Sequence, residues 1–214
     1  MHTLAHMGGP DIRILLSQSL TSTFQDELKT LCIELGGEMR RYPHGFSFNV
    51  QTLRPLGMDW PFEPDAYPPV SVSVEDLEEM NESTYEQYSS DEVEQIVQIA
   101  GFSPITVLDL GAHSNGLISH YVLGALSLYL ATKYQGLIDL MGILNDRSFT
   151  VWKQLSKEAE VQQAIKMYEA YFLGHAGHLW SVTSEGSEGP WFGHYCDAEF
   201  MAWWLKQSEF YLVK

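Results

Sequence analysis

The sequence predicts an α+β fold: a single domain on a mixed β-sheet, with a central buried helix at residues 117–134 and flanking helices. The main observation is the stretch 105–144, which reads as a strand, a turn, a long apolar helix and a second strand. That helix is apolar on nearly every side, which is typical of a helix buried in a core. Elsewhere, strands and helices alternate without the strict βαβ rhythm of a doubly wound sheet, which favours α+β.

Short patterns predict the remaining elements. Alternating apolar and polar residues or short apolar runs indicate strands, and apolar stripes at helical spacing indicate helices. Thr21, Ser90 and Asp197 are candidate N-caps, because each precedes such a helical stripe. Strands are expected at 12–17, 38–42, 46–50, 70–74, 178–183, 191–195 and 210–213, and helices between 21 and 36, 90 and 100, 157 and 173, and 197 and 205.

The domain organisation is expected to be simple. The 214 residues are enough for one well-buried core, and no linker divides the chain. Residues 1–10 lack periodicity and are expected to form a flexible N-terminus, so the single domain should span 11–214. Within it, residues 53–94 form an acidic, proline-rich excursion, because the five prolines between 53 and 69 break regular structure.

Acidic residues dominate the charge of the chain. Its 28 acidic and 12 basic residues give a formal net charge of −16. No lysine or arginine occurs between Arg54 and Lys133, and the 78 residues between them hold 13 acids. Such a field repels nucleic acid and anionic lipid, and it speeds the association of a cationic partner in a salt-dependent way. An acidic surface that only keeps the protein in solution is the alternative explanation.

The segment from Asp59 to Glu94 mixes these acids with aromatic residues. Rings that anchor and carboxylates that bind arginine or lysine are what an interface with a basic protein would use. The alternative is that the aromatic residues pack inward and hold the irregular segment in place. The predicted partner-binding residues are Asp59, Trp60, Glu63, Asp65, Tyr67, Glu75, Asp76, Glu78, Glu79, Glu82, Tyr85 and Glu86.

Residues 107–116 (VLDLGAHSNG) resemble the first strand and glycine loop of Rossmann-type S-adenosylmethionine methyltransferases. In that family, glycines let the backbone approach the cofactor at a strand-to-helix turn. Here His113 and Asn115 occupy positions where the motif has glycine. The 98 residues that follow Gly116 are also few for the rest of that fold. An ordinary turn is therefore expected, with no cofactor and no catalytic residue.

Several histidines could carry chemistry. His175, His178, His194 and Cys196 are zinc-ligand types, but their spacing matches no standard zinc module. No metal is predicted, and whether this group binds one stays open. His120 lies in the buried helix and is expected to be a hydrogen-bonded core residue rather than a base. No nucleophile elbow or P-loop occurs in the sequence.

Three stretches in the second half of the chain resemble a family of small acidic bacterial proteins of uncharacterised function. They are GLIDLMG at 136–142, DAEFMAWWL at 197–205 and FYLVK at 210–214. The stretch MGGPDI at 7–12 also looks like the beginning of such a protein. Proteins of this kind resemble immunity proteins of polymorphic toxin systems. The resemblance implies a cytoplasmic protein that plugs or covers the active site of one cognate toxin.

The expected function is therefore that of a bacterial immunity protein, which binds a basic toxin enzyme through an acidic surface. Nucleic acid and membrane are not expected partners. A cytoplasmic location fits because the chain lacks a signal-peptide pattern, an apolar run long enough to span a bilayer and a disulfide framework. The alternatives are a small enzyme, methyltransferase or metal-dependent, and a nucleic-acid mimic that occupies the basic groove of a DNA-binding protein.

Overall fold

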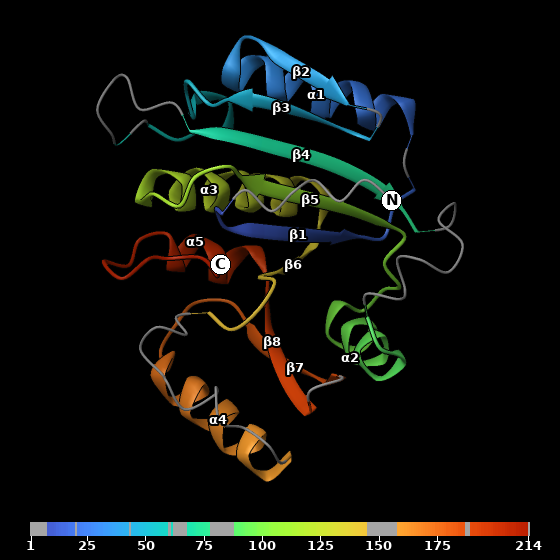
Figure 1. Cartoon of the computed structure of the whole chain (residues 1–214), viewed down its shortest axis with the longest axis vertical. Coiled ribbons are helices and arrows are strands. Elements are labelled where there is room, and N and C mark those ends of the chain that lie inside the picture. Colours follow the sequence, from blue (N-terminus) through green and yellow to red (C-terminus); the bar gives the residue numbers. More distant parts are fainter. Residues whose placement is uncertain are drawn as a thin grey trace.

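The computed structural model describes residues 8–19, 21–42, 44–59, 61, 68–77, 88–144, 158–186 and 189–213. One eight-stranded sheet runs through them in the order β2-β3-β4-β5-β1-β6-β8-β7, from top to bottom in Figure 1. The strands are β1 (Asp11–Leu16), β2 (Met39–Tyr42), β3 (Gly45–Asn49), β4 (Pro69–Asp76), β5 (Thr106–Ala112), β6 (Leu137–Asp139), β7 (Leu179–Gly186) and β8 (Gly189–Cys196). The helices are α1 (Ser22–Gly36), α2 (Ser90–Ala100), α3 (Leu117–Tyr134), α4 (Glu158–Tyr171) and α5 (Ala198–Trp204), with a short 3-10 helix, η1 (Arg54–Leu56).

The α+β class and the single domain are confirmed, but the expectation of a mixed sheet is wrong. Every strand pairing among the described residues is antiparallel. The reason lies in the central unit, where α3 connects β5 to β6. These two strands run in the same direction, but β1 lies between them and is antiparallel to both. A direct pairing of β5 with β6 would have been parallel. The N-terminal strand β1 separates them, so this parallel pairing does not form.

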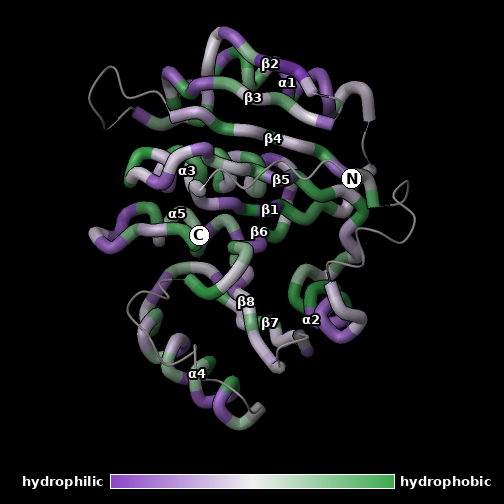
Figure 2. The backbone as a smooth tube through the Cα atoms, in the orientation of Figure 1, coloured by the Kyte–Doolittle hydropathy of each residue, from purple (hydrophilic) through white to green (hydrophobic). Residues whose placement is uncertain are grey.

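The two faces of the sheet differ in how they are covered. On the helix-covered face, the main core joins alternate strand residues such as Ile14, Val72 and Leu110 to residues of α1, α3, α4 and α5. On the opposite face, a smaller core joins Leu15 and Val107 to α2. Hydropathy follows this arrangement, because β1 is largely apolar whereas the edge strand β2 is polar (Figure 2).

Helix α3 is the centre of the main core, as the sequence predicts. It spans Leu117–Tyr134, and ten of its residues are buried, including Leu123, Leu126 and Leu130. The caps of the neighbouring helices also follow local chemistry. The Thr21 side chain accepts a hydrogen bond from the Phe24 N–H at 3.1 Å. The cap of α2 is one residue earlier than expected, because Ser89 and Glu92 form a reciprocal capping box.

The expectation of a closing strand at residues 210–213 is wrong. This segment has no strand partner, and the side chains of Phe210 and Leu212 are buried in the main core. The Leu212 N–H donates instead to Nδ1 of His120 on α3, at 3.1 Å. The burial of Phe210 and Leu212 and this hydrogen bond hold the segment against α3 and the main core.

The structure describes the N-terminal segment from Gly8, and residues 1–7 lie outside its description. Pro10 is buried, and its carbonyl accepts a hydrogen bond from the Ala112 N–H at 3.0 Å. Gly9 passes so close to the Ala112 carbonyl that a Cβ would not fit. These contacts hold residues 9 and 10 against β5, and the flexibility of residues 1–10 stays a prediction. None of the described helices has the length and apolarity needed to cross a bilayer.

Candidate functional site on the polar face of the sheet

Charged residues form a row across the face of the sheet that α2 partly covers. We call this face, with Asp11, Arg13, Ser71, Ser73, Glu75, Asp109, Gly111 and Asp139, the polar face. The strand register places Arg13 opposite Asp109 on β5 and opposite Asp139 on β6. Residues directly opposite on neighbouring strands point to the same face and lie within contact distance. The row runs across the sheet through Gly45, Ser73, Asp109, Arg13, Asp139, Tyr195 and Trp180.

Arg13 holds the centre of this row. Its Nε donates to Asp109 Oδ1 at 2.7 Å, and its terminal nitrogen donates to the Tyr88 hydroxyl at 3.2 Å. The Tyr88 hydroxyl donates in turn to Asp139 Oδ2 at 3.0 Å. Burial by itself disfavours a charged guanidinium, but Tyr88 and Asp109 outweigh it and raise the pKa of Arg13. The guanidinium is therefore charged, and its hydrogen bonds together with that of Tyr88 link β1, β5 and β6 to the segment before α2.

Asp139 is the most perturbed carboxyl of this group. Only 4% of the residue is exposed, and burial raises the pKa of its carboxyl to about 6. The Met141 N–H, Arg13 and Tyr88 favour the ionised form but do not cancel the effect of burial. Such a carboxyl could exchange a proton near neutral pH. A substrate could not reach it, however, because Tyr88 and the other residues under α2 cover it.

Helix α2 is held on the polar face by further paired polar groups. The Tyr195 hydroxyl donates to Glu92 Oε1 at 3.2 Å, and burial raises the pKa of Glu92. Gln95 binds the backbone of the edge strand β7, donating to the Thr183 carbonyl at 2.9 Å and accepting from the Thr183 N–H at 3.1 Å. These hydrogen bonds therefore have a structural role: they dock α2 on the polar face and cover the backbone of the edge strand β7.

The part of the polar face beyond α2 presents carboxylates to solvent. The Asp109 side chain is 30% exposed, against 17% for that of Arg13, and Asp11 and Glu75 are half-buried nearby. Burial raises the pKa of Glu75, and repulsion from Asp109 adds to that effect. The side chains between them are small, because Ser71, Ser73 and Gly111 belong to the same face. Carboxylates outnumber cations here, so the surface suits a positively charged partner.

The structure describes only three of the twelve predicted partner-binding residues. Glu75 lies on the polar face, and Asp76 belongs to β4. Asp59 is exposed and follows Met58, which packs on the helix-covered face, and no described contact joins it to Glu75. The other nine lie outside the described residues, namely Trp60, Glu63, Asp65, Tyr67, Glu78, Glu79, Glu82, Tyr85 and Glu86.

The sequence reading missed the residues that form the row. Arg13, Asp109 and Asp139 each stand alone as a charge inside an otherwise apolar strand, in IRILL, LDL and LID. An isolated charge in such a strand points away from the core that its neighbours build, and that signal could have been used. Tyr88 was expected either at a partner interface or packed inward, and its contacts with Arg13 and Asp139 show the second arrangement.

The glycine loop at 107–116 does not have the surroundings of a methyltransferase cofactor site. Strand β5 is antiparallel to both of its neighbours, whereas the Rossmann fold builds this site on parallel strands. The loop's polar side chains are also engaged within the protein. Ser114 and Ser119 are joined at 2.7 Å, and Asn115 Oδ1 accepts from the Tyr211 hydroxyl at 3.0 Å.

His120 is a hydrogen-bonded core residue, as expected. Its Nδ1 accepts from the Leu212 N–H, so its Nε2 carries the proton and donates to Asn115 Oδ1 at 2.9 Å. These two bonds fix the neutral tautomer. His120 therefore anchors the C-terminal segment to α3.

The histidines of the candidate zinc group, all within the described part of the chain, do not converge on one point. His178 is exposed, stacks on Trp180, and its Nδ1 lies 2.9 Å from Asp197 Oδ2, within hydrogen-bond distance. His194 is fully buried on the helix-covered face, where burial lowers its pKa to about 3 and its Nδ1 accepts from the Leu144 N–H. Within the described part of the chain, no three histidine, cysteine or acidic side chains are placed to hold a metal ion.

Comparisons with known proteins place the chain at the level of a family. Searches among curated proteins and among solved structures find no match. One family model covers nearly the whole chain, from residue 8 to residue 214. The matched span includes every strand of the sheet and every helix around it. The chain therefore belongs to DUF6368, a family of unknown function.

Proposed function

We propose that this protein is a bacterial immunity protein of the cytoplasm, which binds a basic toxin enzyme and blocks its active site. The observation that supports this most is where the base-free stretch of the sequence lies in the fold. Glu75 and Asp109, from that stretch, lie together on the polar face, and Asp11 joins them from β1. The only arginine in this row is already bound to Asp109. The surface therefore keeps a local excess of negative charge.

Binding rather than catalysis is the better reading of this surface. Its solvent-facing groups are half-buried carboxylates and serine hydroxyls on the central strands of the sheet, which can accept hydrogen bonds from arginine and lysine. The strongly perturbed carboxyl, that of Asp139, is covered by the network beneath α2. An acidic face suits fast, electrostatically steered association with a basic protein.

The test is co-expression with the product of the neighbouring gene, followed by size-exclusion chromatography and measurement of the association rate. The charge-reversal variant Glu75→Lys, Glu78→Lys, Glu79→Lys should lower the association rate at low salt by about tenfold or more. The same variant should differ much less from the parent protein at high salt, where steering is screened.

A matched control reverses the same number of charges elsewhere. Glu34, Glu169 and Glu199 are exposed on α1, α4 and α5, the helices of the opposite face. Their replacement by lysine should leave most of the association rate intact. Equal effects of the two triple variants would show that only net charge matters and would refute steering by the acidic stretch that begins at Glu75. A partner whose DNA binding is blocked, rather than its toxicity, would identify a nucleic-acid mimic instead.

A further inference from the structure

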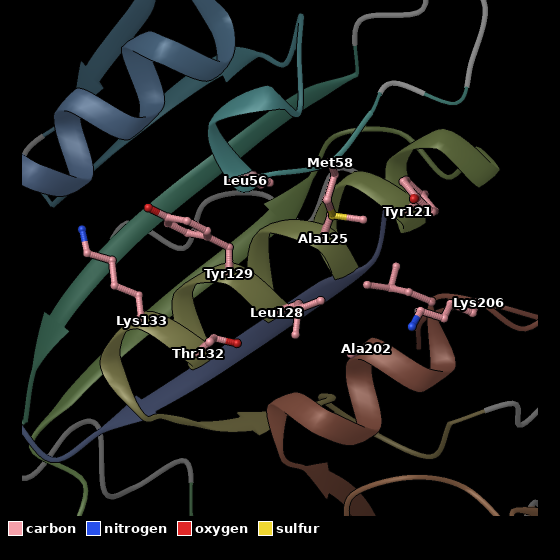
Figure 3. Close-up of a pocket in the computed structure, with 11 residues that line it drawn as sticks. Leu56, Met58, Tyr121, Ala125, Leu128, Tyr129, Thr132, Lys133, Ala202 and Lys206 are labelled. Atoms are coloured by element: carbon pink, nitrogen blue, oxygen red, sulfur yellow. The ribbon is translucent and has the colours of Figure 1, made fainter.

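A second candidate site lies on the helix-covered side, between η1, α3 and α5. It is a groove with a cavity volume of about 530 Å³ (Figure 3). Volumes of this size are typical of sites for small molecules. Its walls are mainly apolar, with Leu56 and Met58 on one side and Leu128 and Leu205 among the residues facing them. This groove is separate from the polar face, because α3 and α5 pack on the other side of the sheet.

The shape of the groove favours a chain-like ligand. It follows one side of α3 from Tyr121 to Lys133, a rise of about 18 Å at 1.5 Å per residue. A single extended alkyl chain can lie along this length, against the apolar residues that line the groove.

The charges of the groove favour an anionic ligand. Although the chain has a net charge of −16, the groove is lined by two lysines and by no acidic residue. Lys133 stands at one end and Lys206 at the other (Figure 3). Lys133 is already paired with Glu27, at 2.7 Å. Among the described residues no carboxylate forms an ion pair with Lys206, so its ammonium group is available to a ligand.

We propose that this groove binds one amphiphilic carboxylate with an unbranched alkyl chain. The carboxylate pairs with Lys206 at the Tyr121 end, and the alkyl chain lies along Ala125 and Leu128 toward Thr132. Burial of the alkyl chain supplies most of the affinity, and the ammonium group of Lys206 selects the head group. This inference is independent of the toxin-binding proposal, since it concerns different residues on a different face.

The test is calorimetric titration of the full chain with dodecanoate and dodecyltrimethylammonium, each below its micelle concentration, and with dodecanol below its solubility limit. Dodecanoate should bind once per chain and at least tenfold more tightly than the cationic amphiphile. Lys206→Gln should remove that preference without abolishing binding of the alcohol. Lys166→Gln, an exposed lysine on α4 outside the groove, is the matched control and should leave the titrations unchanged.

A plugged variant tests the location. Ala202→Trp should fill the groove from the half-buried side of α5 and abolish binding of dodecanoate, while circular dichroism and monomer size stay as in the parent protein. Equal affinity for all three amphiphiles, or no saturable binding of dodecanoate, would overturn the assignment. So would a dodecanoate preference that survives Lys206→Gln. If Ala202→Trp fails to fold, the Lys206→Gln comparison still decides.

Discussion

Replacing Asp139 by asparagine should change how the stability of the protein depends on pH. In the unfolded chain this carboxyl ionises near its ordinary pKa of 3.8, whereas burial raises the folded-state pKa to about 6. Between these values the folded state binds more protons than the unfolded state. Stability contributed by this group therefore falls as the pH rises through the window and is lost above it. Between pH 5 and pH 8 the loss is about 1.4 kcal/mol.

Asparagine preserves the shape of the side chain and removes the titration. Its carbonyl can accept from the Met141 N–H, and its amide can donate to the Tyr88 hydroxyl, where Asp139 now accepts. One rearranged hydrogen bond should lower stability by about 1 kcal/mol at pH 5. At pH 8 that deficit should disappear or reverse, because the parent protein then carries a buried charge that the variant lacks.

The assay is urea unfolding of both proteins at several pH values between 5 and 8. All other groups titrate in both proteins, so the difference between the two unfolding free energies isolates residue 139. Asp91→Asn, at the exposed start of α2, controls for the loss of one surface charge. If the difference in unfolding free energy between the parent protein and Asp139→Asn stays constant from pH 5 to pH 8, the pKa of Asp139 is not raised. That result would also refute burial as the cause.

Three other substitutions test the packing of the helices. Ser89→Ala should lower the unfolding free energy by about 0.5 to 2 kcal/mol, because it removes the capping box of α2, and chemical denaturation would measure this. Gln95→Ala should expose the backbone of β7 and speed amide exchange at Thr183. The unfolding free energy should fall by about 1 to 2 kcal/mol because two hydrogen bonds are lost. Unchanged exchange would show that Gln95 does not protect this edge. Gly124→Ala should cost about 1 to 3 kcal/mol and lower the melting temperature, because its new methyl group would meet the Phe210 ring at 2.7 Å. If Gly124→Ala melts at or above the parent temperature, the contact between α3 and the C-terminal segment is looser than described.

Local sequence patterns determined most of the secondary structure. The apolar surface of residues 117–134 identifies a buried helix because only a helix enclosed by other elements can be apolar on every side. Residues such as Thr21 and Asp197 mark helix starts because a short side chain there satisfies free N–H groups of the first turn. The alternation in VSVSV likewise assigns valines to the core and serines to the polar face. These effects depend on near neighbours in the chain.

Strand order and register were decided only by the tertiary structure. The insertion of β1 between β5 and β6 made the sheet antiparallel, and it brought Arg13 between Asp109 and Asp139, which lie far from it in sequence. No local pattern shows that pairing, because it depends on which strands compete for the same edges. Tertiary packing likewise buried Phe210 and Leu212 in the main core and bound the Leu212 N–H to His120 on α3, where the local pattern predicts a strand. Composition showed that the chain is acidic; long-range pairing decided which of its acids are exposed together and which are buried.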